Sequence, residues 1–221
     1  MWHYLLWVLI GFLSGSVMYS YLLPKWLYHK DITKISKDGN PGCGNVFTCI
    51  GIPCGIACLV LELAKGAVPL WLSLRFLDVN QPLFAAVMTA PVLGHAFSPM
   101  LKRRGGKAIA VTFGTLIGLC SGMWVLFWLA IPLVFFSTVI RIRPHSLRVM
   151  TSYLVMLTAT VLLEPNRIAW LGTFIITAVV IYKHIGDYVG REKRRFDVSI
   201  FSHHLCGRSL SEPESSPSHR A

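Results

Sequence analysis

The chain has 221 residues, of which 54% are hydrophobic and only 14% are charged, and its mean hydropathy is +0.58. A soluble domain of this length rarely carries so little charge. The composition therefore excludes an ordinary soluble protein and indicates an integral membrane protein. The formal net charge of +11 is concentrated in short segments between apolar runs. That placement is typical of membrane topology, and we expect no nucleic-acid partner.

Apolar runs long enough to cross a bilayer, which takes about 20 residues, recur along the chain. We predict seven spans, at residues 4–24, 50–74, 82–101, 107–121, 122–140, 147–163 and 168–183. The second span is interrupted by Glu62 and Lys65. These charges lie three residues apart, and we expect them to neutralise each other, because unpaired charge is costly in lipid. The sequence thus predicts an all-α integral membrane protein with seven transmembrane helices.

The charges between the predicted spans indicate how the chain is oriented. Basic loops alternate with nearly neutral ones in step with seven crossings. The basic loops lie at 25–37, 102–107 and 141–148. Because basic loops stay on the inner side of a membrane, we expect the N-terminus outside and the C-terminus in the cytoplasm.

The end of the chain differs in composition from the rest. Residues 197–221 are rich in Ser, Pro, Glu and His and show no periodicity, which predicts a disordered cytoplasmic tail after a membrane domain at 1–196. The chain's six cysteines lie mostly in apolar stretches and lack the spacing of a zinc site. We interpret them as small apolar residues and expect no metal.

Two loops on the predicted cytoplasmic side suit an anion. The first reads DGNPGCGN, residues 38–45, and contains Asn40, Gly42 and Asn45. Glycine-rich loops of this kind expose backbone N–H groups that bind anions. The second is Gly105-Gly106-Lys107, which opens the fourth span after three basic residues. A helix N-terminus presents free N–H groups and a positive dipole end, which suits a phosphate.

Further polar residues occur at the same predicted membrane face. They are His95, Ser146 and the pair His184 and Asp187, which lie three residues apart on one helix face. Each feature also has a plain structural interpretation. Basic loops contact lipid headgroups, Gly-Gly is ordinary turn chemistry, and a histidine at a span end often simply packs. The functional hypothesis depends on all of them sharing one face.

At these loops the sequence resembles the bacterial acyl-phosphate-dependent glycerol-3-phosphate acyltransferase family, the PlsY-type membrane enzymes. The similarity runs in order along about nine-tenths of the chain. It is carried by GFLSGSVMYSYLL (11–23), GNPGCGNV (39–46), LELAKGAVPL (61–70), GHAFSPMLKRRGGKAIAVTFG (94–114), HSLR (145–148) and KHIGDY (183–188). Members of this family have seven spans and a site on the cytoplasmic face.

The resemblance implies transfer of a fatty acyl group from acyl phosphate to the 1-hydroxyl of glycerol 3-phosphate, giving lysophosphatidic acid. No cofactor is implied, and we expect a monomer in the bacterial cell membrane, among membrane lipids. The implied catalytic residues are His184, Asp187, Asn45 and His95. The implied substrate-binding residues are Asn40, Gly42, Gly105, Gly106, Lys107 and Ser146.

The sequence departs from the family pattern in the first loop. Asp38 stands where the family has serine, and Thr48 stands where it has arginine. Asp187 likewise replaces a typical asparagine. An added anion and a lost cation predict weaker phosphate binding. Two alternatives stay open at this point: an acyltransferase with a changed acceptor or donor, and a non-catalytic membrane partner of the same fold.

Overall fold

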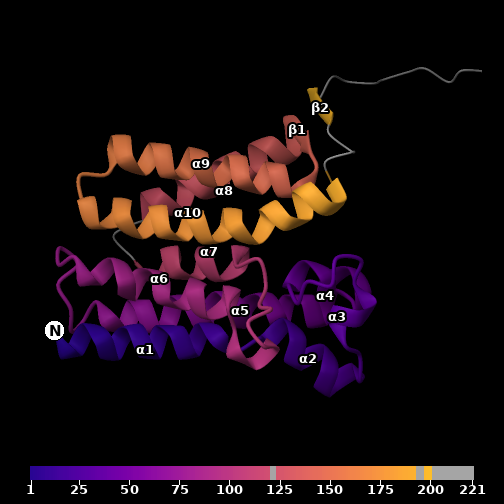
Figure 1. Ribbon diagram of the computed structural model, residues 1–221, viewed down its shortest axis with the longest axis horizontal. Helices are drawn as coiled ribbons and strands as arrows, with labels where there is room; N and C mark the ends of the chain where they lie inside the picture. Colours follow the sequence, from indigo (N-terminus) through magenta and orange to yellow (C-terminus); the bar gives the residue numbers. More distant parts are fainter. Residues whose placement is uncertain (120–122, 193–196, 201–221) are drawn as a thin grey trace, which may run out of the picture.

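The computed structural model of the chain describes residues 1–119, 123–192 and 197–200, and it is helical apart from one small sheet (Figure 1). Its α-helices are α1 (Trp2–Ser16), α2 (Tyr19–Tyr28), α3 (Ile32–Ile35), α4 (Cys43–Cys49), α5 (Ile52–Ser73), α6 (Leu83–Ala96), α7 (Ile109–Gly118), α8 (Met123–Thr138), α9 (His145–Leu163) and α10 (Arg167–Asp187). Short helical turns follow at η1 (Pro99–Leu101) and η2 (Tyr188–Glu192). The strands are β1 (Ile140–Arg143) and β2 (Asp197–Ile200).

The long helices run along one common direction, so the chain passes repeatedly between two ends of the molecule (Figure 1). The N-terminus lies at one end, and α3, α4 and β1 lie at the other. The all-α prediction is confirmed. Five helical segments are long and apolar enough to cross a membrane: Trp2–Tyr28, Ile52–Ser73, Leu83–Leu101, His145–Leu163 and Arg167–Gly190.

The two remaining predicted spans correspond to shorter apolar helices, Ile109–Gly118 and Trp124–Thr138. The boundary expected between them, at residues 121–122, lies outside the described residues. Seven crossings, and the orientation of the termini, therefore stay predictions.

The first predicted span is two helices rather than one. Helix α1 ends at Ser16, and Val17 and Met18 take extended or irregular backbone before α2 begins. The loop after α2 also contains more structure than the sequence predicted, because α3 and α4 form there. Asp31 starts α3 by accepting a hydrogen bond from the backbone N–H of Thr33.

Small residues let the helices approach closely. A Cβ atom at Gly15 would collide with the backbone of Pro91 on α6, and one at Gly94 would collide with the backbone of Phe12 on α1. Helices α5 and α7 pack in the same way, because a Cβ at Gly114 would meet the Leu63 carbonyl. Close backbone contact of this kind is how helices associate where lipid removes the hydrophobic driving force.

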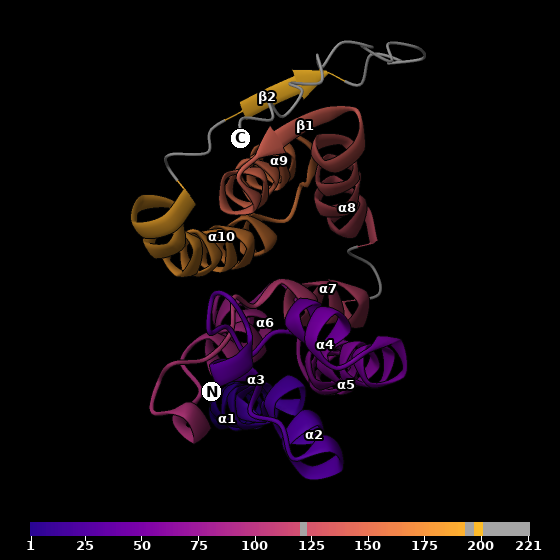
Figure 2. The same ribbon diagram turned by 90° about the vertical axis from the view of Figure 1, so that its right-hand side faces the viewer.

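The helices form two groups (Figure 2). Helices α1 to α7 make one group, and α8, α9 and α10 make the other, with α10 packed on α6 and α8 on α7. Strands β1 and β2 pair antiparallel beside the second group, with Ile140 opposite Ile200. Strand β2 occupies the first four residues of the expected tail, and the boundary between membrane domain and tail at residue 196 stays a prediction. Residues 201–221 lie outside the described residues.

Candidate active site

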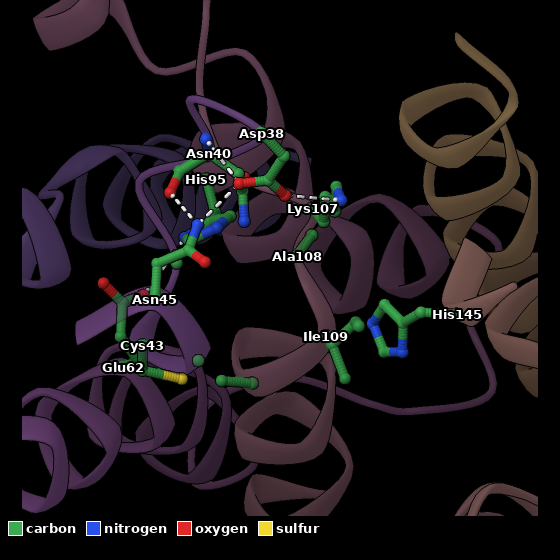
Figure 3. A pocket seen from close by; sticks show the side chains of 13 residues that line it. Asp38, Asn40, Cys43, Asn45, Glu62, His95, Lys107, Ala108, Ile109 and His145 are labelled. Carbon is green, nitrogen blue, oxygen red and sulfur yellow. Dashed lines mark hydrogen bonds and ion pairs between the residues drawn. The ribbon is translucent and has the colours of Figure 1, made fainter. Parts of the chain in front are cut away.

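A cavity of about 180 Å³ opens where the two helix groups meet, at the end that carries α3 and α4 (Figure 3). Five separate parts of the chain form its wall: the loop entering α4 with the start of that helix, the start of α7, and single residues of α5, α6 and α9. The lining residues are Asp38, Asn40, Gly42, Cys43, Gly44, Asn45, Glu62, His95, Lys107, Ala108, Ile109, Ala110 and His145. The structure thus brings together five residues that the sequence singled out: Asn40, Gly42, Asn45, His95 and Lys107.

The N-terminus of α7 faces this cavity. Ala108 precedes the helix in the left-handed conformation, with φ of 62°, and makes no side-chain cap hydrogen bond. Ile109 and Ala110, whose backbone N–H groups belong to the first turn, line the cavity. Unused N–H groups and the positive end of the helix dipole favour an anion at this position.

Lys107 lies between two carboxylates from distant parts of the chain. Its Nζ is 2.9 Å from Asp38 Oδ2 and 2.6 Å from Asp187 Oδ2. Asp38 also organises its own loop, because Oδ1 accepts from the Asn45 amide at 2.7 Å and from the backbone N–H of Asn40 at 3.1 Å. We call Asp38, Lys107 and Asp187 the clamp. It joins the first loop, the start of α7 and the end of α10.

Two groups of the clamp, Asp38 and Lys107, have pKa values shifted in the direction that favours their charged forms. Burial raises the pKa of Asp38, but hydrogen bonds from Lys107 and Asn45 outweigh it and leave the pKa below the ordinary value. Burial lowers the pKa of Lys107, and hydrogen bonds to Asp187 and Asp38 more than offset it, so this pKa is raised. Asp38 is therefore not the unpaired anion that the sequence suggested, since it has a cation as its partner.

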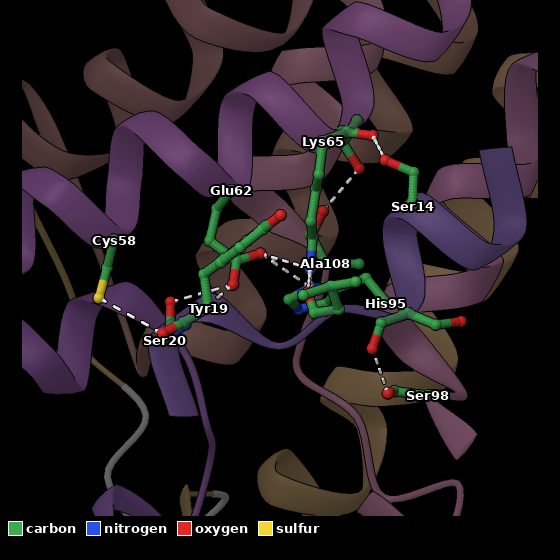
Figure 4. A network of polar contacts seen from close by, with 12 residues as sticks. Ser14, Tyr19, Ser20, Cys58, Glu62, Lys65, His95, Ser98 and Ala108 are labelled. Carbon is green, nitrogen blue, oxygen red and sulfur yellow. Dashed lines mark hydrogen bonds and ion pairs between the residues drawn. The ribbon is translucent and has the colours of Figure 1, made fainter. Parts of the chain in front are cut away.

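A second charged cluster adjoins the cavity, because two of its members, Glu62 and His95, are among the lining residues (Figure 4). Lys65 Nζ is 2.7 Å from Glu62 Oε2, 2.9 Å from His95 Nδ1 and 2.6 Å from the Val17 carbonyl, to which it donates. Glu62 Oε1 accepts from the backbone N–H and the hydroxyl of Ser20. We call Glu62, Lys65 and His95 the knot. It ties the break between α1 and α2 to α5 and α6, and the expected Glu62–Lys65 neutralisation is confirmed.

The two glycines before Lys107 have a steric role. A Cβ at Gly105 would collide with the His95 carbonyl, and one at Gly106 would collide with His95 Nε2. Neither glycine is among the residues that line the cavity. The Gly-Gly pair lets this loop pack directly on the knot, and phosphate binding by its backbone stays a prediction.

His184 and Asp187 do not act as a hydrogen-bonded pair with each other in the described contacts. Asp187 binds Lys107, whereas His184 is buried and its Nδ1 lies 2.8 Å from the Val180 carbonyl of its own helix. The His184 ring lies 6.3 Å from the ring of His145, which lines the cavity. Ser146 is fully buried at the start of α9. Of the second helix group, His145 lines the cavity, whereas Ser146, His184 and Asp187 are not among its lining residues.

Among the lining residues that the sequence did not single out as site residues are His145 and Cys43, which carry reactive side chains. His145 precedes the singled-out Ser146, and its cavity position follows from where α9 starts. Cys43 begins α4, and burial raises the pKa of its thiol, so it contributes an uncharged surface. Cys43 lies in the Gly-rich loop and His145 in the HSLR stretch, so both belong to motifs that the sequence analysis identified. Only the fold shows that the two residues line the same cavity.

Helices of membrane-spanning length around a cavity with a basic side chain and a helix N-terminus define an integral membrane protein with a polar cavity of a chemistry that suits an anion. A family model described as glycerol-3-phosphate acyltransferase matches residues 5–190. The chain belongs to this family.

Relatives and solved structures agree with this assignment. The chain is 32% identical to a glycerol-3-phosphate acyltransferase of Desulfovibrio desulfuricans over 81% of this chain and 78% of the relative. It is 43% identical to glycerol-3-phosphate acyltransferase 1 of Thermotoga maritima, over 48% of this chain and 53% of the relative. The matched segment thus spans about half the length of that relative. The crystal structure of PlsY (YgiH), an integral membrane glycerol 3-phosphate acyltransferase in its glycerol 3-phosphate form, superposes with a TM-score of 0.70. That likeness has 24% identity, covers 86% of this chain and 94% of the other, and shows the shared fold.

Proposed function

We propose that this protein transfers a fatty acyl group from acyl phosphate to the 1-hydroxyl of glycerol 3-phosphate in phospholipid synthesis. The observation that carries the proposal is the cavity at the N-terminus of α7, with Lys107 at its edge. Membership of the family and the relatives' names support the same reaction.

The chemistry suits a site of this kind. The acceptor hydroxyl attacks the acyl carbonyl carbon, the bond from that carbon to the phosphate oxygen breaks, and inorganic phosphate leaves. The products are lysophosphatidic acid and phosphate, and the hydroxyl proton passes to the departing phosphate. Because the donor is already activated, the protein mainly has to hold two phosphates and align the reacting groups.

Roles for individual residues follow from their positions. Lys107 and the first turn of α7 bind phosphate, and Asn40, Gly42 and Asn45 shape the opposite wall. His184, Asp187 and Ser146 complete the site from α9 and α10. His95 acts from the knot, where it supports the Gly106 loop.

We propose further that the chain crosses the bacterial cell membrane seven times, with the N-terminus outside and the cavity on the cytoplasmic side. In this proposal, one membrane domain spans residues 1–196 and is followed by a cytoplasmic tail, residues 197–221. We propose that the protein acts as a monomer. Support comes from the basic loops, which gather at the cavity end.

Topology is tested with single cysteines, in a background without native cysteines, and an impermeant thiol reagent on intact cells. Asn80→Cys, at the opposite end from the cavity, should be labelled, and Arg104→Cys should be protected. Labelling of Arg104→Cys from outside would overturn this orientation.

The reaction is tested with purified protein, palmitoyl phosphate and labelled glycerol 3-phosphate. We expect labelled lysophosphatidic acid and an equal amount of released phosphate. Absence of product with an intact, folded protein would refute the proposed activity.

A further inference from the structure

Two carboxylates, those of Asp38 and Asp187, already bind Lys107, the lysine that we propose binds phosphate. Lys107 is 12% exposed, and the side chains of Asp38 and Asp187 are 29% and 22% exposed. Asp38 and Lys107 line the cavity, and Asp187 contacts Lys107 while remaining partly exposed to solvent. Both short contacts to Lys107 Nζ are charge-assisted hydrogen bonds, the stronger kind.

The charge around this lysine is unfavourable for a second anion. The clamp has two carboxylates and one ammonium, so its formal charge is −1. Behind it, Glu62 is balanced by Lys65 within the knot. Lys183 on α10 donates to the Ala96 carbonyl at 3.0 Å, and its positive charge interacts with Asp187 but not with Asp38. A phosphate that approaches Lys107 thus meets two negative groups already bonded to it.

We propose that Asp38 and Asp187 are specificity-determining residues that compete with the substrate phosphate for Lys107. A phosphate-bearing acceptor binds only when it displaces at least one carboxylate, whereas an uncharged hydroxyl acceptor donates to the carboxylates without displacing them. The clamp therefore narrows the preference for glycerol 3-phosphate over glycerol. This inference rests on the proposed function and adds to it the acceptor chemistry that the site selects.

The direct test is calorimetric binding of inorganic phosphate to purified protein in detergent. Asp187→Asn keeps the size of the side chain and a hydrogen-bond acceptor but removes the charge. We expect it to tighten phosphate binding about tenfold, the scale of one charge-assisted contact. Asp38→Asn should act in the same direction. Asp187→Glu, which retains the charge, should bind phosphate as the wild type does.

Two controls separate competition from a general charge effect. Asp78→Asn removes one negative charge at the opposite end of the molecule and should leave phosphate binding unchanged. Lys107→Met placed in the Asp187→Asn protein should abolish the gain, because the gain requires the released lysine. Unchanged or weaker phosphate binding in folded Asp187→Asn and Asp38→Asn proteins would overturn the proposal.

Kinetics provide a second readout. The ratio of kcat/KM for glycerol 3-phosphate to kcat/KM for glycerol should rise about tenfold in Asp187→Asn, through a lower KM for glycerol 3-phosphate. Binding and turnover can fail separately. No turnover in any variant, with the expected order of phosphate affinities, refutes the acyl transfer and retains the clamp. Normal turnover with equal phosphate affinities refutes the clamp and retains the acyl transfer.

Discussion

Lys65 and Lys107 are both bound by carboxylates, but one is sealed among helices and the other faces a cavity. In the knot, the Lys65 and Glu62 side chains are each 1% exposed, and their remaining bonds go to Ser20, Val17 and His95. In the clamp, exposures run from 12% to 29%. The same ion pairing thus fixes helices in one place and leaves a cation within reach of a ligand in the other.

The difference in burial predicts different consequences of mutation. A buried charge that loses its partner has no water to replace it, so its removal destabilises the fold. A partly exposed ion pair exchanges one partner for another at small cost in free energy, because solvent screens the charges. Mutations in the knot should therefore change mainly the stability of the protein, and mutations in the clamp should change mainly ligand binding.

The largest expected effect is on the knot. Glu62→Ala leaves Lys65 charged and without its carboxylate inside the helices, which should destabilise the protein by about 3–5 kcal/mol. The measurement is thermal unfolding in detergent. Asp38→Ala, which breaks the clamp, is the matched control and should lower the Tm by much less. Equal losses in the two variants would contradict the comparison.

The next effect concerns the contact between the knot and the loop before α7. Gly106→Ala places a methyl group against His95 Nε2, and overpacking of this kind costs about 1–3 kcal/mol. Because the loop holds Lys107 in place, KM for glycerol 3-phosphate should rise more than kcat falls. Gly44→Ala is the control, since a Cβ there meets no atom within 4 Å. Wild-type kinetics and stability in Gly106→Ala would show that the loop does not depend on His95.

The clamp predicts a particular pH dependence of stability. The lowered pKa of Asp38 means that its contribution is present above the ordinary carboxyl pKa and is lost as the pH falls through the folded value. The raised pKa of Lys107 means that its contribution is present below the ordinary lysine pKa and is lost as the pH rises through the folded value. The Tm difference between wild type and Asp38→Asn should therefore stay level between about pH 5 and 9 and shrink below about pH 4. A difference that titrates near neutrality would point to another group.

The smallest expected effect is at Thr48. Its exposed hydroxyl bonds the Asn45 carbonyl at 3.1 Å, one turn along α4 from a residue that lines the cavity. A guanidinium at this position reaches towards the same cavity. Thr48→Arg should lower KM for glycerol 3-phosphate about threefold, in line with a partly exposed charge. Combination with Asp38→Ser should give more than the product of the two effects, because both act on one ligand.

The sequence predicted those features that depend on local pattern. Apolar runs gave the helical segments, and the spacing of Glu62 and Lys65 gave their ion pair, because residues three apart meet on a helix. It failed where the outcome depends on distant parts of the chain. The break at Val17 and Met18 is stabilised by Lys65, which is 48 residues away from the carbonyl that it binds.

The residues of the candidate site likewise divide into those that the sequence predicted and those whose role only the fold shows. Gly-rich and basic motifs marked both loops that form the cavity, so Asn45 and Lys107 were found from the sequence. The effect of Asp38 was not, because its partner Lys107 lies 69 residues further along the chain. The replacement at Asp38, which the sequence presents as an added negative charge, is in three dimensions half of an ion pair.

The account's central claim is that the cavity beside α7 carries the reaction and that Lys107 binds phosphate there. The most direct measurement compares kcat/KM for glycerol 3-phosphate in purified wild type and Lys107→Met, with Lys34→Met on α3 as the charge-matched control. We expect Lys107→Met to lose about a hundredfold in kcat/KM, because truncating one partner of a hydrogen-bonded charge pair costs about 2–5 kcal/mol, while Lys34→Met stays at the wild-type level. Wild-type kinetics in a folded Lys107→Met protein would contradict the claim.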